Sequence, residues 1–328
     1  MRSGWSALWG IGFAAAAVLS LHSDANADHP GAVARLSNSA TAPAAATRKY
    51  ERTVTTPVVP PPHVAPVTPV PPWTADPITG NADRLAGADH DRANMVAFTF
   101  DDGPDPLTTP TVLAALEKYN IPASFFIVTR HLGDPKRAAE ARTLIQREVA
   151  AGFMIGSHTA HHANLGEAGA VQLAREVDGS LAMLGPVVNQ PIGMFRPPYG
   201  RLSPRGRQHL RQLGLTEVRW SIDPRDWQAT EAPDLRQKIL GEILNADGGV
   251  VLLHDVHAIT AGVIAQVFDD LEHFNCHRLA LKKAPIIPVS LHYFLRDNGV
   301  SRPVPQAVQD RTDAYIRALP ERCSRRRS

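Results

Sequence analysis

Three residues with metal-binding side chains follow short apolar runs of the sequence: Asp102, His158 and His162. Two imidazoles and one carboxylate are a common ligand set for Zn²⁺, and such a set leaves coordination positions open for water and substrate. His161 offers the same donor as His162, so the spacing by itself leaves the choice between them open. The pattern favours a catalytic metal site over a structural one.

Other polar side chains that could hold or transfer a proton also stand after apolar runs. Asp101 directly follows Phe100, and Arg196 directly follows Phe195. A guanidinium beside Asp101 would orient that carboxylate and keep it ionised, and backbone N–H groups in the loop after Arg196 would meet an oxyanion. Taken alone, each of these segments is more typical of a turn at the surface than of a catalytic site.

A histidine in the second half of the chain is a candidate general acid. His254 directly follows one apolar run, and Asp223, Asp226 and Trp227 follow another. An aspartate beside His254 would hold the imidazole protonated, as a general acid requires, and Trp227 would line the substrate pocket. Without such partners, His254 is an ordinary imidazole at the end of a strand.

The elements that must position these side chains alternate along the chain. Apolar runs predict strands, and the stretches between them repeat apolar residues at helical spacing, with Thr109 expected to cap the first helix. The strands are predicted at 95–100, 123–128, 153–155, around 195, 217–222, 250–253 and 286–291. The first helix is predicted to begin at Pro110 and to end before Asn120, and the others are predicted at 135–151, 168–184, 204–213, 233–244 and 262–274.

Repeated strand–helix units of this kind imply a parallel sheet with helices outside it. Their number favours a barrel over a small open sheet. In such barrels the active site is built by the loops at the carboxyl ends of the strands. The polar residues that follow the apolar runs are therefore expected to meet at one rim.

Five segments carry these residues. They are Thr99-Phe100-Asp101-Asp102-Gly103-Pro104, His158-Thr159-x-x-His162, Arg196-Pro197-Pro198-Tyr199, Asp223-x-x-Asp226-Trp227 and Leu252-Leu253-His254-Asp255. Together, and in this order, they resemble the motifs of the polysaccharide deacetylases that have the NodB-homology domain. The resemblance covers about residues 93 to 292. It implies an α/β fold, a distorted (β/α) barrel with fewer complete units than the eight-stranded form.

The resemblance also implies a role for each polar residue. The metal ligands would be Asp102, His158 and His162, which selects His162 over His161. Asp101 would be the catalytic base, positioned by Arg196.

The acid side of the site and the pocket are implied in the same way. His254 would be the general acid, tuned by Asp226, and the backbone N–H of Tyr199 would face the oxyanion. The substrate pocket around the acetyl methyl would be lined by Pro198, Trp227 and Leu253.

The activity that this resemblance implies is the hydrolysis of a carbon–nitrogen bond in a linear amide. N-acetyl groups would be removed from N-acetylglucosamine-containing polysaccharide (peptidoglycan, chitin-like oligomers or exported poly-N-acetylglucosamine), releasing acetate. Zn²⁺ is the expected ion, with Co²⁺, Mn²⁺ and Ni²⁺ as alternatives. The competing hypotheses are an O-acetyl esterase that acts on xylan-like glycans and a non-catalytic glycan-binding module.

The ends of the chain differ in composition from its middle. Residues 1–27 combine an early arginine, an apolar run and the small-x-small triplet Ala25-Asn26-Ala27, which is the layout of a secretory signal. An uncleaved membrane anchor is the alternative. The remaining divisions are expected to be an Ala/Pro-rich linker at 28–91, a catalytic domain at 92–297 and a solvated tail at 298–328.

The expected compartment is periplasmic, cell-envelope or secreted, and the cysteines fit it. Cys276 and Cys323 are the two cysteines of the sequence, and an oxidising compartment would let them form a disulfide. The alternative is two free thiols.

The charge of the chain is nearly balanced. It has 34 Lys and Arg against 32 Asp and Glu, a formal net charge of +2. This gives no electrostatic reason to expect nucleic acid as a partner. The expected partner is an acetylated glycan, membrane contact is expected only if the N-terminal segment is retained, and the protein is expected to be a monomer.

Overall fold

The computed structural model describes residue 78, residues 82–85 and residues 93–326. The expected signal segment and most of the expected linker therefore lie outside the described residues. Within the described part, no helix is both long and apolar enough to cross a membrane.

Parallel strands form the central sheet, in the order β5-β4-β3-β2-β1-β6, and β7 pairs with the start of β1. The strands are β1 (Met95–Asp101), β2 (Ala123–Ile127), β3 (Met154–Ser157), β4 (Met194–Phe195), β5 (Thr216–Glu217), β6 (Gly248–His254) and β7 (Ile287–Pro288). Because all the pairs are parallel, the carboxyl ends of β1, β3 and β6 open at the same edge.

The chain after β5 crosses to the opposite edge of the sheet. There Ile222 pairs with Val251 of β6, and the Leu252 N–H donates to the Ile222 carbonyl at 2.9 Å. The strand predicted at 217–222 is thus divided, since Glu217 belongs to β5 whereas Ile222 pairs with β6. The sheet curls back on itself in this way, and the expected distorted (β/α) barrel is confirmed.

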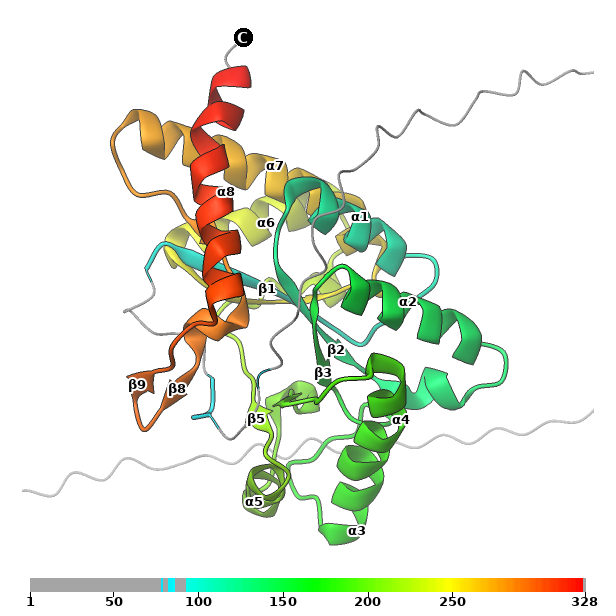
Figure 1. Cartoon of the computed structure of the whole chain (residues 1–328). Helices are drawn as coiled ribbons and strands as arrows, with labels where there is room; N and C mark the ends of the chain where they lie inside the picture. Colours follow the sequence, from blue (N-terminus) through cyan, green and yellow to red (C-terminus); the bar gives the residue numbers. More distant parts are fainter. Residues whose placement is uncertain (1–77, 79–81, 86–92, 327–328) are drawn as a thin grey trace, which may run out of the picture. The chain divides into compact units, whose positions relative to one another are not determined.

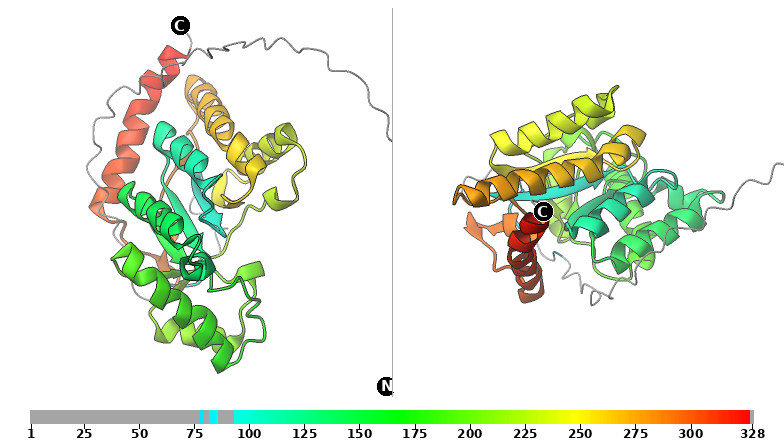
Figure 2. Two further views of the ribbon diagram at one scale, coloured as in Figure 1. Left: turned by 90° about the vertical axis from the view of Figure 1, so that its right-hand side faces the viewer. Right: turned by 90° about the horizontal axis from the view of Figure 1, so that it is seen from above.

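Helices cover the outer side of the strands (Figures 1 and 2). They are α1 (Thr109–Tyr119), α2 (Ala138–Ala150), α3 (Ala170–Leu173), α4 (Gly179–Val188), α5 (Pro204–Gln212), α6 (Ala232–Asn245) and α7 (Ala258–Ala280), with a π-helical turn at Ala174–Asp178 that joins α3 to α4 and 3₁₀ turns at Thr129–Gly133, Pro198–Gly200, Asp226–Gln228 and Leu291–Phe294. Neighbouring helices pack on one another in the order α6, α7, α1, α2 and α4.

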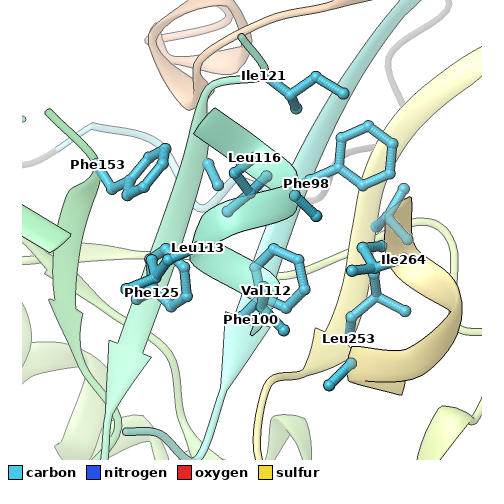
Figure 3. Close-up of a cluster of buried hydrophobic side chains, with 14 of the residues drawn as sticks. Phe98, Phe100, Val112, Leu113, Leu116, Ile121, Phe125, Phe153, Leu253 and Ile264 are labelled. Carbon is cyan, nitrogen blue, oxygen red and sulfur yellow. The ribbon is translucent and has the colours of Figure 1, made fainter. Parts of the chain in front are cut away.

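The main hydrophobic core lies between the strands and helices α1 and α7, as Figure 3 shows. Phe100 of β1 stacks on Phe125 of β2 with ring centroids 5.2 Å apart, and Phe98 meets Phe268 of α7 edge-on at 5.0 Å. Side chains alternate between the two faces of a strand. With Phe98 and Phe100 facing the helices, Asp101 faces the interior of the barrel.

Thr109 does not have the role that the sequence predicted for it. The N-cap of α1 is Thr108, and Thr109 is the first residue of the helix. The buried Thr109 hydroxyl accepts the Asp105 N–H at 2.8 Å and donates to the carboxylate of Asp255. Thr109 therefore links the loop after β1 to the loop after β6.

The C-terminal residues fold into the domain and do not form the expected solvated tail. They comprise the hairpin β8 (Arg296–Asp297) and β9 (Val300–Ser301) and the helix α8 (Gln306–Arg325), drawn in red in Figure 1. Tyr315, Leu319 and Cys323 are buried on one side of α8, in a second hydrophobic core. They recur every four residues, which is a helical period that was readable in the sequence.

A disulfide joins α8 to α7 and confirms the pairing of Cys276 with Cys323. The two cysteines are 47 residues apart, and closing a loop of that size in the unfolded chain is worth about 4 kcal/mol in a chain-entropy treatment. Arg326 adds ion pairs to Asp269 and Glu272 of α7. These bonds make α8 an integral part of the domain.

Two residues of the expected linker are also buried. Ile78 and Leu85 each expose 3% of their surface. Leu85 pairs with Val218, and the Asp83 N–H donates to the Arg296 carbonyl at 2.8 Å. The folded domain therefore includes residues before position 92, which the Ala/Pro-rich composition of this region concealed.

Glu148 of α2 is a fully buried carboxyl group. Its two oxygens find no hydrogen-bond partner among the described residues. Burial, together with the charge of Asp255, raises the pKa of Glu148 well above its usual value of 4.5. Ionisation is then harder in the folded protein than in the unfolded chain, so the free energy of unfolding falls as pH rises from 4.5 through the folded-state pKa.

Glu148→Gln is expected to remove this pH dependence. Relative to the parent, the variant should gain up to about 1.4 kcal/mol of unfolding free energy for each pH unit between 4.5 and the folded-state pKa of Glu148. Urea unfolding at pH 5 and pH 8 measures the gain. Glu140→Gln, on the exposed side of the same helix, is the matched control and should show no such trend. A gain for Glu148→Gln that is equal at the two pH values would contradict a buried ionisable carboxyl.

Candidate active site

The three expected metal ligands lie together at the carboxyl ends of β1 and β3. Asp102 directly follows β1, and His158 directly follows β3. Asp102 Oδ1 is 3.6 Å from His158 Nε2 and 3.3 Å from His162 Nε2. One donor atom from each of the three residues lies within 4.8 Å of the other two, so the three side chains converge on one point.

The hydrogen bonding of these donors fits a bound cation. His158 Nδ1–H donates to the Arg196 carbonyl at 2.7 Å, which leaves the Nε2 lone pair facing Asp102. Burial lowers the pKa of His158 to about 3, so this ring is neutral, as a metal ligand must be. Asp102 Oδ1 is buried and accepts no hydrogen bond from any residue that the structure describes. A buried carboxylate oxygen without a donor, beside two imidazole nitrogens, suits a divalent metal ion.

His161 points away from this cluster. Its side chain is 60% exposed, and its Nδ1 lies 3.2 Å from Glu176 Oε1. The spacing of the sequence left the choice between His161 and His162 open, and it is His162 that lies in the cluster with Asp102 and His158.

Asp101 lies beside the cluster and is held by Arg196. Arg196 Nη1 donates to Asp101 Oδ1 at 2.7 Å and to Thr99 Oγ1 at 2.8 Å. The guanidinium is fully buried and stacks over the Phe126 ring at 4.1 Å. Asp101 Oδ2 is left 3.7 Å from His158 Nε2. One carboxylate oxygen is thus fixed and the other faces the cluster.

The environment of Asp101 suits a proton acceptor. Burial raises the pKa of its carboxyl, and the charge of Arg196 acts in the opposite direction without cancelling that rise. A carboxylate with a raised pKa takes up a proton more readily than one in water, while the hydrogen bond from Arg196 fixes its direction.

His254, the last residue of β6, is paired with Asp226. Its Nδ1–H donates to Asp226 Oδ1 at 2.7 Å, and its backbone N–H donates to Asp226 Oδ2 at 2.7 Å. Thr260 adds a third hydrogen bond to Asp226 at 2.8 Å. Burial by itself lowers the pKa of His254, but the hydrogen bond and charge of Asp226, with Asp101 and Asp102, raise it to about 9. The imidazole is therefore protonated at neutral pH and presents Nε2–H.

A cavity of about 380 Å³ joins the metal-binding cluster to His254. Tyr199 and Trp227 stand at its rim, with 63% and 53% of their surfaces exposed. The residues that line the cavity are Asp101, Asp102, His158, His162, Tyr199, Trp220, Asp223, Trp227, Leu252 and His254. Acidic, basic and apolar side chains thus surround a space large enough for a sugar unit.

Comparison with known proteins identifies the family. A sequence profile described as polysaccharide deacetylase matches residues 88–218. The chitooligosaccharide deacetylase of Sinorhizobium fredii is 33% identical over 164 residues, which cover 50% of this chain and 73% of that protein. This chain belongs to the polysaccharide deacetylase family. The peptidoglycan-N-acetylglucosamine deacetylase PgdA of Listeria monocytogenes is also 33% identical, over 51% of this chain, but the match spans only a third of the length of PgdA.

Solved structures give the same fold. A peptidoglycan N-acetylglucosamine deacetylase solved with a hydroxamate-type benzamide matches with a TM-score of 0.51 and 25% identity, over 60% of this chain and 88% of that one. A mutant of a pseudoenzyme from carbohydrate esterase family 4 has a TM-score of 0.50 and 22% identity, over 56% and 65% of the two chains. The likeness to the pseudoenzyme shows the fold alone.

The cavity is lined by Leu252, and the prediction that Leu253 would line it is wrong. Leu253 is fully buried in the main core, where Figure 3 shows it near Val112 and Phe100. Successive residues of a strand point to opposite faces, so Leu252 shares the face of His254 and Leu253 does not. The side-chain period of two, counted back from His254, was the signal that could have assigned the face.

Of the other two residues expected to line the pocket, one lines the cavity and the other does not. Trp227 lines the cavity, whereas Pro198 is buried and is absent from the lining residues that the structure describes. Tyr199 lines the cavity with its ring and has a left-handed backbone, with φ of 58°. The role of its backbone N–H towards an oxyanion stays a prediction.

Three further residues support the site, although no role was predicted for them from the sequence. Trp220 lines the cavity and its ring lies 5.6 Å from the Arg196 guanidinium. Thr99, already bonded to Arg196, is two residues before Asp101 and so shares its face of β1, which was a usable signal. Thr260, which binds Asp226, lies in the first turn of α7 and has no comparable signal in the sequence.

Proposed function

We propose that this chain is a metal-dependent hydrolase that removes N-acetyl groups from N-acetylglucosamine-containing polysaccharide. The observation that carries the proposal is that Asp102, His158 and His162 converge at the wall of the cavity that Asp101 and His254 also line. The relatives named as peptidoglycan-N-acetylglucosamine and chitooligosaccharide deacetylases support this class of substrate.

Asp102, His158 and His162 would hold the ion, for which we propose Zn²⁺. A nitrogen-rich set with one carboxylate suits Zn²⁺ better than Mg²⁺ or Ca²⁺, which prefer oxygen ligands. When bound, the ion would polarise the acetyl carbonyl and make a water molecule more acidic.

Asp101 is proposed as the base that starts the hydrolysis. Its Oδ2 faces the cluster while Arg196 holds Oδ1 at 2.7 Å, so the carboxylate can accept the proton of the attacking water without turning away. The water oxygen bonds to the acetyl carbon, and the carbonyl oxygen becomes an oxyanion. The Tyr199 backbone N–H is proposed as a donor to that oxyanion.

His254 is proposed as the acid that completes the reaction. Its Nδ1–H is bound by Asp226, so Nε2–H is the proton directed into the cavity. As the bond between the acetyl carbon and the sugar nitrogen breaks, that nitrogen takes the proton from Nε2. The products are acetate and a glucosamine unit. Leu252 and Trp227 would contact the acetyl group and the sugar from the apolar side of the cavity.

We also propose that the protein is exported. The Cys276–Cys323 disulfide supports this location, because structural disulfides persist in oxidising compartments and are rare in the cytosol. The layout of residues 1–27 as a secretory signal supports it as well.

Acetate release from a panel of substrates tests the proposed function. The panel comprises N-acetylglucosamine oligomers, peptidoglycan, poly-N-acetylglucosamine and acetylated xylan, each with and without a chelator. We expect release from the N-acetylated substrates, lost with the chelator and restored by Zn²⁺. Release from acetylated xylan alone would favour the O-acetyl esterase, and release that the chelator leaves unchanged would remove the metal from the proposal.

A further inference from the structure

The loop that carries His162 has an unfavourable backbone conformation. Thr159 and His162 have positive φ values of 71° and 59°. Side chains other than glycine rarely adopt this region, and such a conformation persists only where the surrounding structure holds it. Something outside the loop must therefore keep His162 in place.

Glu176 binds the two residues between these positions. Its Oε2 accepts the backbone N–H of His161 at 2.9 Å, and its backbone carbonyl accepts the N–H of Ala160 at 2.9 Å. Its Oε1 accepts from His161 Nδ1 at 3.2 Å and from Arg175 Nε at 3.0 Å. One residue thus holds two consecutive amides of the loop.

The carboxylate of Glu176 is well suited to this role. It is fully buried, whereas the side chain of the adjacent Arg175 is 66% exposed. A carboxylate has only acceptors, so it can receive all three N–H groups at once. An amide of the same shape has one acceptor oxygen and turns an NH₂ towards one of the donors.

Glu176 lies in the π-helical turn Ala174–Asp178, between α3 and α4. A π turn inserts one residue into a helix, and each residue of an α-helix corresponds to a rotation of about 100°. The turn therefore sets which residue of the segment faces the loop.

We propose that Glu176 is a positioning residue for His162, and through His162 for the metal site, so that it sets the affinity of the protein for its cation. The inference rests on the proposed function, because it assumes that Asp102, His158 and His162 bind a metal. It adds a residue that the five sequence motifs do not contain.

Metal titration of the apo protein tests the proposal, with Glu176→Gln as the variant. We expect its affinity for Zn²⁺ to fall by about 10- to 100-fold, the range found for partners that orient metal ligands. The visible spectrum of the Co²⁺ form should change as well, because it reports ligand geometry.

Asp178→Asn is the matched control. It makes the same chemical change in the same turn, but Asp178 is 43% exposed and bonds His209 instead of the loop. Its affinity should stay within about twofold of the parent, because exposed ion pairs contribute little. His161→Ala removes the ring contact and keeps the backbone N–H, so its loss should be smaller than that of Glu176→Gln.

Thermal unfolding of each apo variant shows whether it folds. If Glu176→Gln does not fold, Glu176→Asp is used in its place. The aspartate keeps the negative charge but moves the carboxylate away from the loop by one methylene, so the affinity for Zn²⁺ is again expected to fall. A folded Glu176 variant that binds Zn²⁺ as the parent does, with an unchanged Co²⁺ spectrum, overturns the inference. If the parent itself binds no metal, the proposed function fails instead, so the two failures are distinguishable.

Discussion

His158→Ala is expected to abolish metal binding and acetate release together. Substitution of partners outside the ligand set already costs 10- to 100-fold in affinity, so removal of a ligand should cost more than about 100-fold. The buried Nε2 of His158 faces both Asp102 and Asp101, and it is one of the three donor atoms of the cluster that the described residues form. Metal content of the purified variant and acetate release from N-acetylglucosamine oligomers measure the two losses.

His161→Ala is the control for this prediction. His161 belongs to the same segment and has the same side chain, but it points away from the cluster. Its loss of metal affinity should be far smaller than that of His158→Ala, because only the contact of its ring with Glu176 is removed. Asp102→Ala should behave as His158→Ala does, because Asp102 Oδ1 is the carboxylate donor of the cluster. A His158→Ala protein that binds one equivalent of metal and releases acetate would refute the ligand assignment.

His254→Ala is expected to retain the metal and to lose turnover. General acid catalysis typically contributes 10²- to 10⁴-fold, so kcat should fall by about that amount while the metal content stays unchanged. The metal content should not change because His254 is not one of the three expected ligands. Its Nδ1–H is held by Asp226, and its Nε2–H faces the cavity.

Asp226→Asn tests the hydrogen-bonded pair of His254 and Asp226 by changing the carboxylate instead of the imidazole. Asp226 accepts from the backbone and ring of His254 and from Thr260, so the variant should lower kcat by loss of the protonated imidazole. Residues that act as a unit are not additive. The double variant with His254→Ala should therefore be no slower than His254→Ala alone. A further loss of similar size in the double variant would mean that Asp226 acts independently of His254.

The sequence predicted the fold and most of the polar site for a physical reason. Parallel strands present their carboxyl ends at one edge, so the residues that follow β1, β3 and β6 had to meet wherever the barrel closed. Asp101, Asp102, His158 and His254 needed only correct strand ends, which apolar runs mark clearly. The predicted strand boundaries were least accurate at 217–222, where the chain changes its pairing partner from β4 to β6. Hydrophobic periodicity marks a strand but does not indicate which other strand it pairs with.

Tertiary structure alone decided the contacts between elements that are distant in sequence. Glu176 reaches the loop of His162 because a π turn and a fold of the chain bring them together, and no local pattern records that approach. The same holds for the hydrogen bond of Thr260 to Asp226 and for Glu148, which is buried without a partner among the described residues.

Two other features could have been predicted from periodicity in the sequence. The side-chain period of two along β6 indicates the face of Leu252, and the apolar residues spaced by four indicate the buried side of α8. The sequence by itself thus determined the order of strands and helices and which polar residues stand at the strand ends, because local periodicity marks where each strand ends. The role of each polar residue was implied by the resemblance to the polysaccharide deacetylases. The packing of remote segments fixed how those groups are held and which wall the substrate meets, because burial and hydrogen bonding depend on neighbours that only the folded chain supplies.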